Sequence, residues 1–354
     1  MRVDLTQLGL PIIQAPLAGG PSTPRLAAAV SEVGAFGFLA AGYKAPDTVR
    51  DDIRDLRALT DAPFGLNIFA PPAPADSAAL ERYATTLAAD AERYGVALGE
   101  PRHDDDAFEG KVRLAADEAI AVVSFTFGCP SPGIVRRLHD ADADVWVTVT
   151  SPAEAREAQE AGADALVVQG FEAGGHRGYF IDDPGAEDYG LIALLRLVAD
   201  RVALPLIGAG GIADGAALAA VLCAGAVAGQ IGSALMLAAE AGTSAAHRAA
   251  LRTGGSTALT RAFSGRQARG IVNRFMREHG DDAPIAYPDV HHLTAPLRAA
   301  ARTAADPEAV NLWAGQGYTL AAQAPAAEIV TRIAADARST LAAVGARLGG
   351  GQQA

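Results

Sequence analysis

The sequence predicts an α/β fold, a (β/α)8 TIM barrel with an inserted or appended cap segment. Eight short, mostly apolar runs recur within residues 1–241, and alanine-rich amphipathic segments separate them. Apolar runs without strict alternation are typical of parallel strands that are buried on both faces. Eight strand and helix pairs match the repeat number and the size of this barrel.

Each expected strand is a short, mostly apolar run. The eight runs are Pro11–Ala15, Ala35–Ala40, Phe64–Phe69, Ala121–Phe127, Val145–Thr150, Ala165–Gln169, Leu204–Ala209 and Ala226–Ile231. Helical patterns lie between them, and the clearest are Pro24–Val33, Pro46–Leu59, Pro152–Ala161 and Asp214–Ala224. For the third of these helices, Ser151 supplies an N-cap, Pro152 suits the first position and Glu154 places an acid in the first turn.

Two segments do not fit a minimal barrel of residues 1–241. Residues 71 to about 111 separate the third and fourth strands by more than one helix, so we predict an insertion there. Residues 242–323 mix helix and loop character, and we predict a cap over the barrel mouth. Its expected helix breakers are Pro284, Pro288, Pro296 and Pro307. Residues 324–354 are predicted to form a C-terminal helix, Pro325–Leu348, that packs back on the barrel and frays from Gly349.

Composition and charge exclude several classes of protein. The 354-residue chain has a net charge of −12 and no visible basic face, so we expect no nucleic-acid partner. The two cysteines, Cys129 and Cys223, form neither a disulfide framework nor a metal-binding spacing. A cytoplasmic protein without a metal is therefore the expectation. Residues 216–239 carry no charge, but three glycines and Gln230 interrupt them, so we expect a helix, a turn and a strand and no membrane span.

The most informative segment is the loop Gly170–Gly178, which follows the sixth apolar run. Glycines let backbone N–H groups approach a ligand closely, and His176 can donate or accept a proton near neutral pH. A loop just past a strand end is where a barrel of this kind builds its chemistry. Taken alone, His176 could equally be a surface histidine and Arg177 a solvated arginine.

Polar residues and glycines follow several other expected strands and would converge on one mouth. Gly208–Gly211 and Gln230–Ser233 follow the seventh and eighth strands, where barrels often bind phosphate through backbone N–H groups. Asn67 and Gln169 supply amides that can donate and accept at once, which suits the mixed edge of a flavin ring. Each signal has a plainer explanation, namely a tight turn, a turn residue or the capping of backbone groups. Their shared position at strand ends favours a ligand site.

Motifs along nearly the whole chain resemble the nitronate monooxygenase family of FMN-dependent barrel enzymes, in its bacterial class I form. The similar stretches are Gln14–Gly20, Gly37–Tyr43, Phe64–Phe69, Phe125–Ser131, Ala173–Gly178 and Asn311–Gly317. Together they are highly specific, although the glycine-histidine loop alone is shared with related flavin enzymes.

The resemblance implies one non-covalently bound FMN, no metal, and His176 as the catalytic residue. The implied cofactor-binding residues are Ala15, Pro16, Asn67, Gln169, Gly174, Gly175, Gly210, Gly211, Gln230, Gly232 and Ser233. Tyr318 would shape the substrate pocket from the cap. The implied reaction is oxidation of an alkyl nitronate, propionate 3-nitronate in the cell, by O₂ to a carbonyl compound plus nitrite or nitrate. It would use one-electron transfer and an anionic flavin semiquinone. From their composition alone, the alanine-rich faces of the cap would pack either against the barrel or against the second subunit of a homodimer.

Two other functions fit the same loop. A flavin-dependent enoyl-acyl-carrier-protein reductase would use NAD(P)H on a similar barrel, and a non-catalytic flavin-binding barrel would do no chemistry. The Phe125–Ser131 and Asn311–Gly317 stretches favour the monooxygenase. Arg177, Arg266 and Arg269 are candidate local cations for an anionic substrate, although solvated arginines are the expectation.

Overall fold

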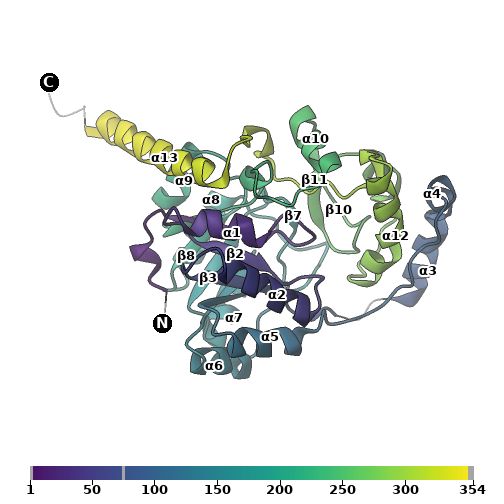
Figure 1. The fold of residues 1–354 in the computed structure, drawn as a ribbon, viewed down its shortest axis with the longest axis horizontal. Coiled ribbons are helices and arrows are strands. Elements are labelled where there is room, and N and C mark those ends of the chain that lie inside the picture. The colour runs from purple at the N-terminus through teal and green to yellow at the C-terminus, as the bar shows by residue number, and fades with distance from the viewer. Residues whose placement is uncertain (1–2, 74–75, 350–354) are drawn as a thin grey trace.

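Eight parallel strands close into a ring in the computed structural model, which describes residues 3–73 and 76–349 (Figure 1). The strands are β1 (Ile12–Gln14), β2 (Gly37–Ala40), β3 (Phe64–Phe69), β4 (Val122–Thr126), β5 (Asp144–Val149), β6 (Ala165–Gln169), β8 (Leu206–Ala209) and β9 (Ala228–Ile231). Their order around the ring is β1-β9-β8-β6-β5-β4-β3-β2. A parallel bridge between Ile13 and Phe36 joins the two ends, and Gln14 N donates to Phe36 O at 2.9 Å. The predicted barrel is confirmed, and each expected apolar run overlaps one of these strands.

Helices alternate with the strands along the chain, as the sequence predicts. They are α1 (Pro24–Ser31), α2 (Pro46–Arg57), α5 (Phe108–Asp117), α6 (Pro132–Asp140), α7 (Pro152–Ala161), α8 (Leu191–Ala199), α9 (Gly215–Cys223) and, at the end, α13 (Ala326–Gly349). The start of α7 shows how local chemistry sets a boundary, because the Ser151 side chain accepts a hydrogen bond from Glu154 N and Pro152 is the first helical residue. The helix ends at Gly162, whose φ of 97° disfavours residues with a side chain.

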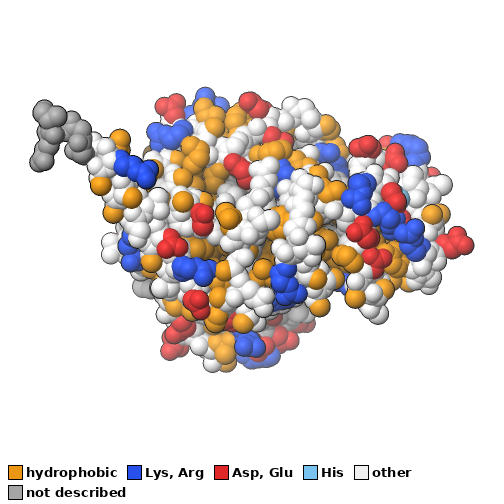
Figure 2. All heavy atoms as spheres, turned by 90° about the horizontal axis from the view of Figure 1, so that it is seen from above, with side chains coloured by type: hydrophobic (Ala, Val, Ile, Leu, Met, Phe, Trp, Pro, Cys, Tyr) orange, Lys and Arg blue, Asp and Glu red, His pale blue; other side chains and the backbone are white. Residues whose placement is uncertain are grey.

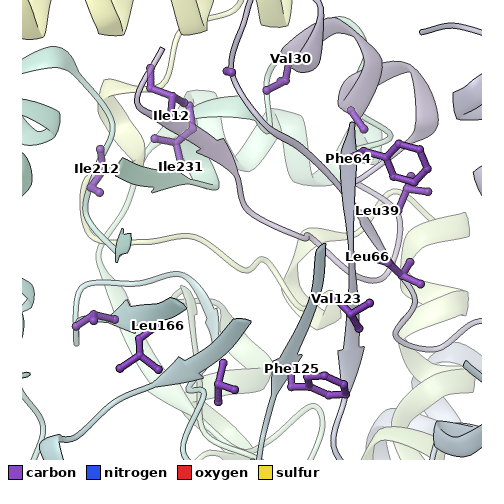
Figure 3. Close-up of a cluster of buried hydrophobic side chains, with 14 of the residues drawn as sticks. Ile12, Val30, Leu39, Phe64, Leu66, Val123, Phe125, Leu166, Ile212 and Ile231 are labelled. Atoms are coloured by element: carbon purple, nitrogen blue, oxygen red, sulfur yellow. The ribbon is translucent and has the colours of Figure 1, made fainter. Parts of the chain in front are cut away.

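Side chains alternate between the two faces of each strand and divide the barrel core into two layers. Ile12 and Leu166 belong to a cluster that also contains side chains of the surrounding helices, and Figure 3 shows part of this outer layer. Their neighbours Ile13 and Val167 belong to a separate inner cluster. Because both layers are buried, the strands are apolar on both faces, which explains the unbroken apolar runs in the sequence.

Aromatic side chains fill the barrel interior near the amino-terminal ends of the strands. Phe36, Phe38 and Trp146 pack around one another, and each pair of ring centroids is 5.6 Å apart. This end of the barrel is therefore closed. Along the inner rows the side chains become polar toward the carboxyl-terminal ends, for example at Asn67 on β3 and Gln169 on β6. The space for a ligand is at that end.

A second group of elements has a core of its own. Its members are α3 (Ser77–Thr86), α4 (Ala88–Tyr94), β7 (Gly175–His176), α10 (Ala245–Thr253), β10 (Thr257–Thr260), β11 (Ala268–Ile271), α11 (Arg274–His279) and α12 (Asp289–Thr303). The strands form an antiparallel sheet in the order β10-β11-β7. Helices α3 and α4 of the insertion lie beside α12 (Figure 1), and Leu80 shares a buried cluster with Leu293. The division of the chain at residues 241 and 323 stays a prediction.

Short 3-10 helices occupy several of the connections. They are η1 (Leu5–Gln7), η2 (Ser233–Leu235), η3 (Pro307–Ala309) and η4 (Tyr318–Leu320). Of these, η2 and η4 carry Ser233 and Tyr318, two of the predicted site residues. Both residues are therefore held by local backbone structure.

The expected helix breaker Pro296 lies inside α12, so that prediction was wrong. Proline has no N–H, and the helical hydrogen bond to His292 O is therefore missing. The N–H of Gly99, in the insertion, bonds to the neighbouring Leu293 O at 2.9 Å. A Cβ atom at position 99 would lie only 2.1 Å from His292 O. Close packing from a distant segment thus supports a helix that the local sequence disfavours.

The surface carries charges of both signs. On the face shown in Figure 2, Lys and Arg side chains are interspersed with Asp and Glu side chains. Within the described residues, no helix is long and apolar enough to cross a membrane. Helix α13 runs to Gly349, and the predicted frayed tail beyond it lies outside the described residues.

Gly215→Ala is expected to disturb the packing of α13 on α9. A Cβ atom at Gly215 would lie 2.4 Å from Ala337 N, which is backbone and cannot rotate away. Overpacking of this kind costs roughly 1–3 kcal/mol. The matched control is Gly345→Ala in α13, because a Cβ atom there meets nothing within 4 Å and alanine favours a helix by roughly 1 kcal/mol. Urea denaturation should show lower stability for the first variant alone, and equal losses would contradict this packing.

Candidate active site

A cavity of about 500 Å³ lies at the carboxyl-terminal ends of the barrel strands. Strand ends, the Gly170–Gly178 loop and parts of residues 242–323 line it together. The lining includes every predicted site residue: Ala15, Pro16, Asn67, Gln169, Gly174, Gly175, His176, Gly210, Gly211, Gln230, Gly232, Ser233 and Tyr318. Closure of the ring brings these residues together from distant parts of the chain.

His176 lines the cavity from β7, which pairs with β11 through Ala268. Its Nε2 lies 2.8 Å from Ser264 Oγ. The Ser264 hydroxyl donates its single proton to Arg266 O at 3.2 Å, so it accepts from Nε2–H and leaves the Nδ1 lone pair free. Burial, followed by the charges of Arg266 and Arg298, lowers the pKa of His176 to about 3. The imidazole is therefore neutral at physiological pH.

The side-chain amide of Gln169 is held in one orientation. Its Oε1 accepts hydrogen bonds from Arg177 Nη1 at 3.0 Å and from Gly178 N at 2.8 Å. Its Nε2 donates to His176 O at 3.1 Å. One N–H therefore remains for a ligand, and both lone pairs of Oε1 are occupied. Gln169 therefore offers a ligand a donor and no acceptor.

The side-chain amide of Asn67 is held through its nitrogen, and its oxygen is left without a partner among the described residues. Its Nδ2 donates to Ser124 O at 3.2 Å, to Ser124 Oγ at 2.9 Å and to Thr126 Oγ1 at 3.0 Å. Among the described residues no group donates to its Oδ1. Asn67 and Gln169 thus present one acceptor and one donor to the cavity, and neither amide is free to rotate.

The three arginines that were expected to be solvated are buried, so that expectation was wrong. Arg177, Arg266 and Arg269 are 0 %, 5 % and 3 % exposed. Backbone carbonyls and aromatic rings take the place of water. Arg266 Nε donates to Arg177 O at 3.2 Å, and its guanidinium lies 4.1 Å from the centroid of the Phe127 ring. The Arg269 guanidinium lies 4.5 Å from the Phe171 ring centroid. Arg177 and Arg266 contact Gln169 and Phe127, which line the cavity.

The loops after β8 and β9 present backbone donors. Within the part of the chain that the structure describes, the N–H groups of Gly210, Gly211 and Ser233 have no hydrogen-bond partner. The Ser233 hydroxyl accepts from Gly315 N at 2.9 Å, so its own proton remains to be donated. In the loop after β6, Gly175 has a φ of +74°, and a Cβ atom there would meet nothing within 4 Å, so the absence of a side chain leaves room in the cavity. Unpaired N–H groups of this kind suit an anion such as phosphate.

Comparison with known proteins points to one family. The family model described as "Nitronate monooxygenase" matches residues 3–336. A nitronate monooxygenase of Paraburkholderia phytofirmans is 39 % identical over 352 residues, which is 96 % of each chain. One of Pseudomonas aeruginosa is 39 % identical over 350 residues, covering 93 % of this chain and 96 % of its own. The chain belongs to the nitronate monooxygenase family.

Solved structures agree with membership of the nitronate monooxygenase family. A nitroalkane oxidase from Streptomyces ansochromogenes is 47 % identical, covers 96 % of this chain and 99 % of its own, and has a TM-score of 0.93. FabK from Thermotoga maritima is 27 % identical, covers 97 % of each chain and has a TM-score of 0.76. An enoyl reductase domain of MlnA from Bacillus amyloliquefaciens shares the fold at 11 % identity and a TM-score of 0.63. As a member of the family, the chain is a flavin-dependent oxidoreductase.

Some residues that line the cavity were not predicted from the sequence. They include His247, His291, Arg298 and Arg302. The last three, with Ala295, recur at intervals of 4, 3 and 4 residues and so share one face of α12. This period was visible in the sequence, but it did not show that the face would line a cavity.

The stability of the protein should fall as the pH is lowered, and His247→Gln tests one cause. His247 is 7 % exposed, its Nε2 donates to Trp313 O at 3.0 Å, and burial lowers its pKa from 6.5 to about 4. Below pH 6.5 the unfolded chain binds a proton that the folded chain does not, so stability present above pH 6.5 is lost as the pH falls toward 4.

The His247→Gln variant has no titrating group at this position. Its free energy of unfolding should therefore fall by about 2 kcal/mol less than that of the parent between pH 7 and pH 5. Urea denaturation at both pH values gives the difference. An identical pH dependence in the variant and the parent would contradict the buried neutral state of His247.

Proposed function

We propose that this chain binds FMN in the cavity and oxidises alkyl nitronates with O₂ to a carbonyl compound plus nitrite or nitrate. Propionate 3-nitronate is the proposed substrate in the cell. The observation that carries the proposal is a neutral His176 in the same cavity as one fixed acceptor, one fixed donor and several free backbone N–H groups. One O₂ for each nitronate balances to nitrate, and one O₂ for two nitronates balances to nitrite.

The residues of the cavity fit FMN. A volume of about 500 Å³ lies in the usual range for cofactor sites. The edge of an isoalloxazine ring carries both carbonyl acceptors and an N–H donor, which the Gln169 N–H and the Asn67 Oδ1 would match. The N–H groups of Gly210, Gly211 and Ser233 would hold the phosphate. The remaining proposed contacts come from Ala15, Pro16, Gly174, Gly175, Gln230 and Gly232.

His176 is the proposed catalytic residue. When bound, FMN would accept an electron from the nitronate, so the protein must position the substrate and balance its charge. With Nε2–H donated to Ser264, the Nδ1 lone pair can remove the α-proton of a neutral nitroalkane, and the resulting imidazolium can donate to a nitro oxygen. A nitronate that arrives as an anion raises the pKa of His176, because negative charge favours the imidazolium.

Tyr318 is proposed to shape the substrate pocket. Its hydroxyl donates to Gly255 O at 2.9 Å, and its side chain is 2 % exposed. Because the hydroxyl proton is already engaged, the aromatic ring would contribute shape rather than a proton.

His176→Asn is expected to keep FMN bound and to slow anaerobic flavin reduction by propionate 3-nitronate roughly 100- to 1,000-fold, because asparagine cannot become the cation that would balance the charge of the nitronate. Stopped-flow absorbance of the flavin measures the rate. His139→Asn is the control, since His139 lies on α6 and pairs with Asp164 at 2.8 Å, away from the cavity residues. Unchanged kinetics in His176→Asn would remove this residue from the mechanism.

Reaction with NADPH separates the proposed function from its rivals. Oxygen uptake with a nitronate, together with slow flavin reduction by NADPH, would support nitronate oxidation. Rapid bleaching of the flavin by NADPH would favour an enoyl reductase. A full flavin complement without oxygen uptake on any nitronate would favour a flavin-binding protein.

Ser233→Ala should weaken the binding of FMN but not that of riboflavin, because only FMN has the phosphate that the hydroxyl would reach. A lost hydrogen bond to a charged group costs roughly 1.5–3 kcal/mol, so the FMN dissociation constant should rise about 10- to 100-fold. Titration of the apoprotein, followed by flavin fluorescence, gives both constants. An equal loss for the two flavins would place the phosphate elsewhere.

A further inference from the structure

Helix α12 places a buried positive charge in the same cavity as His176. Arg298 lines this cavity, and its side chain is largely enclosed, with 6 % exposed. His291 and Arg302 line it from the same face of the helix. None of the three has a role in the FMN contacts proposed above.

Hydrogen bonds fix the Arg298 guanidinium in place. Its Nε donates to Thr294 Oγ1 at 3.1 Å, and its Nη2 donates to His291 O at 2.6 Å. The Thr294 hydroxyl donates its own proton to Phe263 O at 2.6 Å, so toward Arg298 it acts purely as an acceptor. Among the described residues, Arg298 Nη1 has no hydrogen-bond partner. Its two N–H groups are thus held in position and free for a ligand.

No carboxylate of the described residues forms an ion pair with Arg298. Burial lowers its pKa to about 10, and the neighbouring groups that contribute are Tyr43 and Arg302. Arg302 adds a second positive charge instead of a counter-ion. A buried charge without a partner destabilises a fold, so its presence beside a reaction site calls for a function.

We propose that Arg298 is the subsite for a carboxylate on the substrate and selects nitronates that carry a second anionic group. The inference rests on the proposed nitronate oxidation and assigns a specificity residue to it. A guanidinium binds a carboxylate through a planar set of N–H groups, which Arg298 presents with Nη1 free. The nitronate group would lie at His176 and the carboxylate at Arg298. A simple alkyl nitronate would leave the enclosed guanidinium without an anion.

Substrate preference tests the subsite. Arg298→Gln should lower kcat/KM for propionate 3-nitronate roughly 10- to 100-fold, mainly through KM, and should lower kcat/KM for ethyl nitronate by a much smaller factor. The control is Arg277→Gln, because the Arg277 side chain is 60 % exposed on α11. Oxygen uptake gives the rates. A uniform loss for both nitronates, or no loss for either, would overturn the proposal.

Binding without turnover gives a second readout. Isothermal titration calorimetry of the holoenzyme should show that succinate binds, that its uncharged diamide does not, and that Arg298→Gln weakens succinate binding at least tenfold. Equal succinate binding by the parent and the variant would overturn the subsite, while oxygen uptake with ethyl nitronate would still support nitronate oxidation. Arg298-dependent succinate binding in a protein that oxidises no nitronate would uphold the subsite and reject the proposed function.

Arg298→Lys tests the subsite even if the Arg298→Gln variant fails to fold. Lysine keeps the charge but lacks the planar fork, so a folded Arg298→Lys protein should lose part of its preference for propionate 3-nitronate. Thermal unfolding checks the fold. A folded lysine variant with the full parental preference would also contradict a carboxylate subsite.

Discussion

The closed ring of parallel strands is the constraint on which the site depends. All eight strands run in one direction, and alternate side chains face the interior, so each inner row ends at the same mouth. The Phe36, Phe38 and Trp146 rings fill the opposite end, which leaves the mouth as the place for a ligand. The Ile13–Phe36 bridge completes the ring. Without it, the first strand would not be held between β9 and β2.

Hydrogen bonds between the barrel loops and residues 242–323 make the two parts one site. Gly315 N donates to the Ser233 hydroxyl at 2.9 Å, and Gln316 N donates to Glu172 O at 2.9 Å. A Cβ atom at Gly174 would lie 2.3 Å from Gly315 N, so the two backbones approach more closely than a side chain allows. The short strand β7, which carries His176, pairs with β11 from the later segment. The catalytic candidate is therefore positioned by both parts.

Burial of the side chains sets the electrostatics of the cavity. Burial keeps His176 neutral and leaves Arg298 charged without a carboxylate partner. The enclosed charge of Arg298 disfavours the folded protein, and an anionic substrate would offset this cost and favour protonation of His176. The net charge of −12 does not oppose this, because exposed charges are screened over about 10 Å while the nearby guanidiniums are not.

The sequence by itself determined the strand positions, the helix caps and the loops that gather at the mouth, because apolar runs, Ser-Pro caps and glycines act over a few residues. It also placed Asn67 and Gln169 near strand ends and His176 in the loop after the sixth strand. Only the tertiary structure decided which atom of each amide faces the cavity, since Arg177 and Gly178 orient Gln169 while Ser124 and Thr126 orient Asn67. It likewise buried the arginines, carried α12 through Pro296 and turned Arg298 toward the cavity, because those outcomes depend on partners that are distant in the chain.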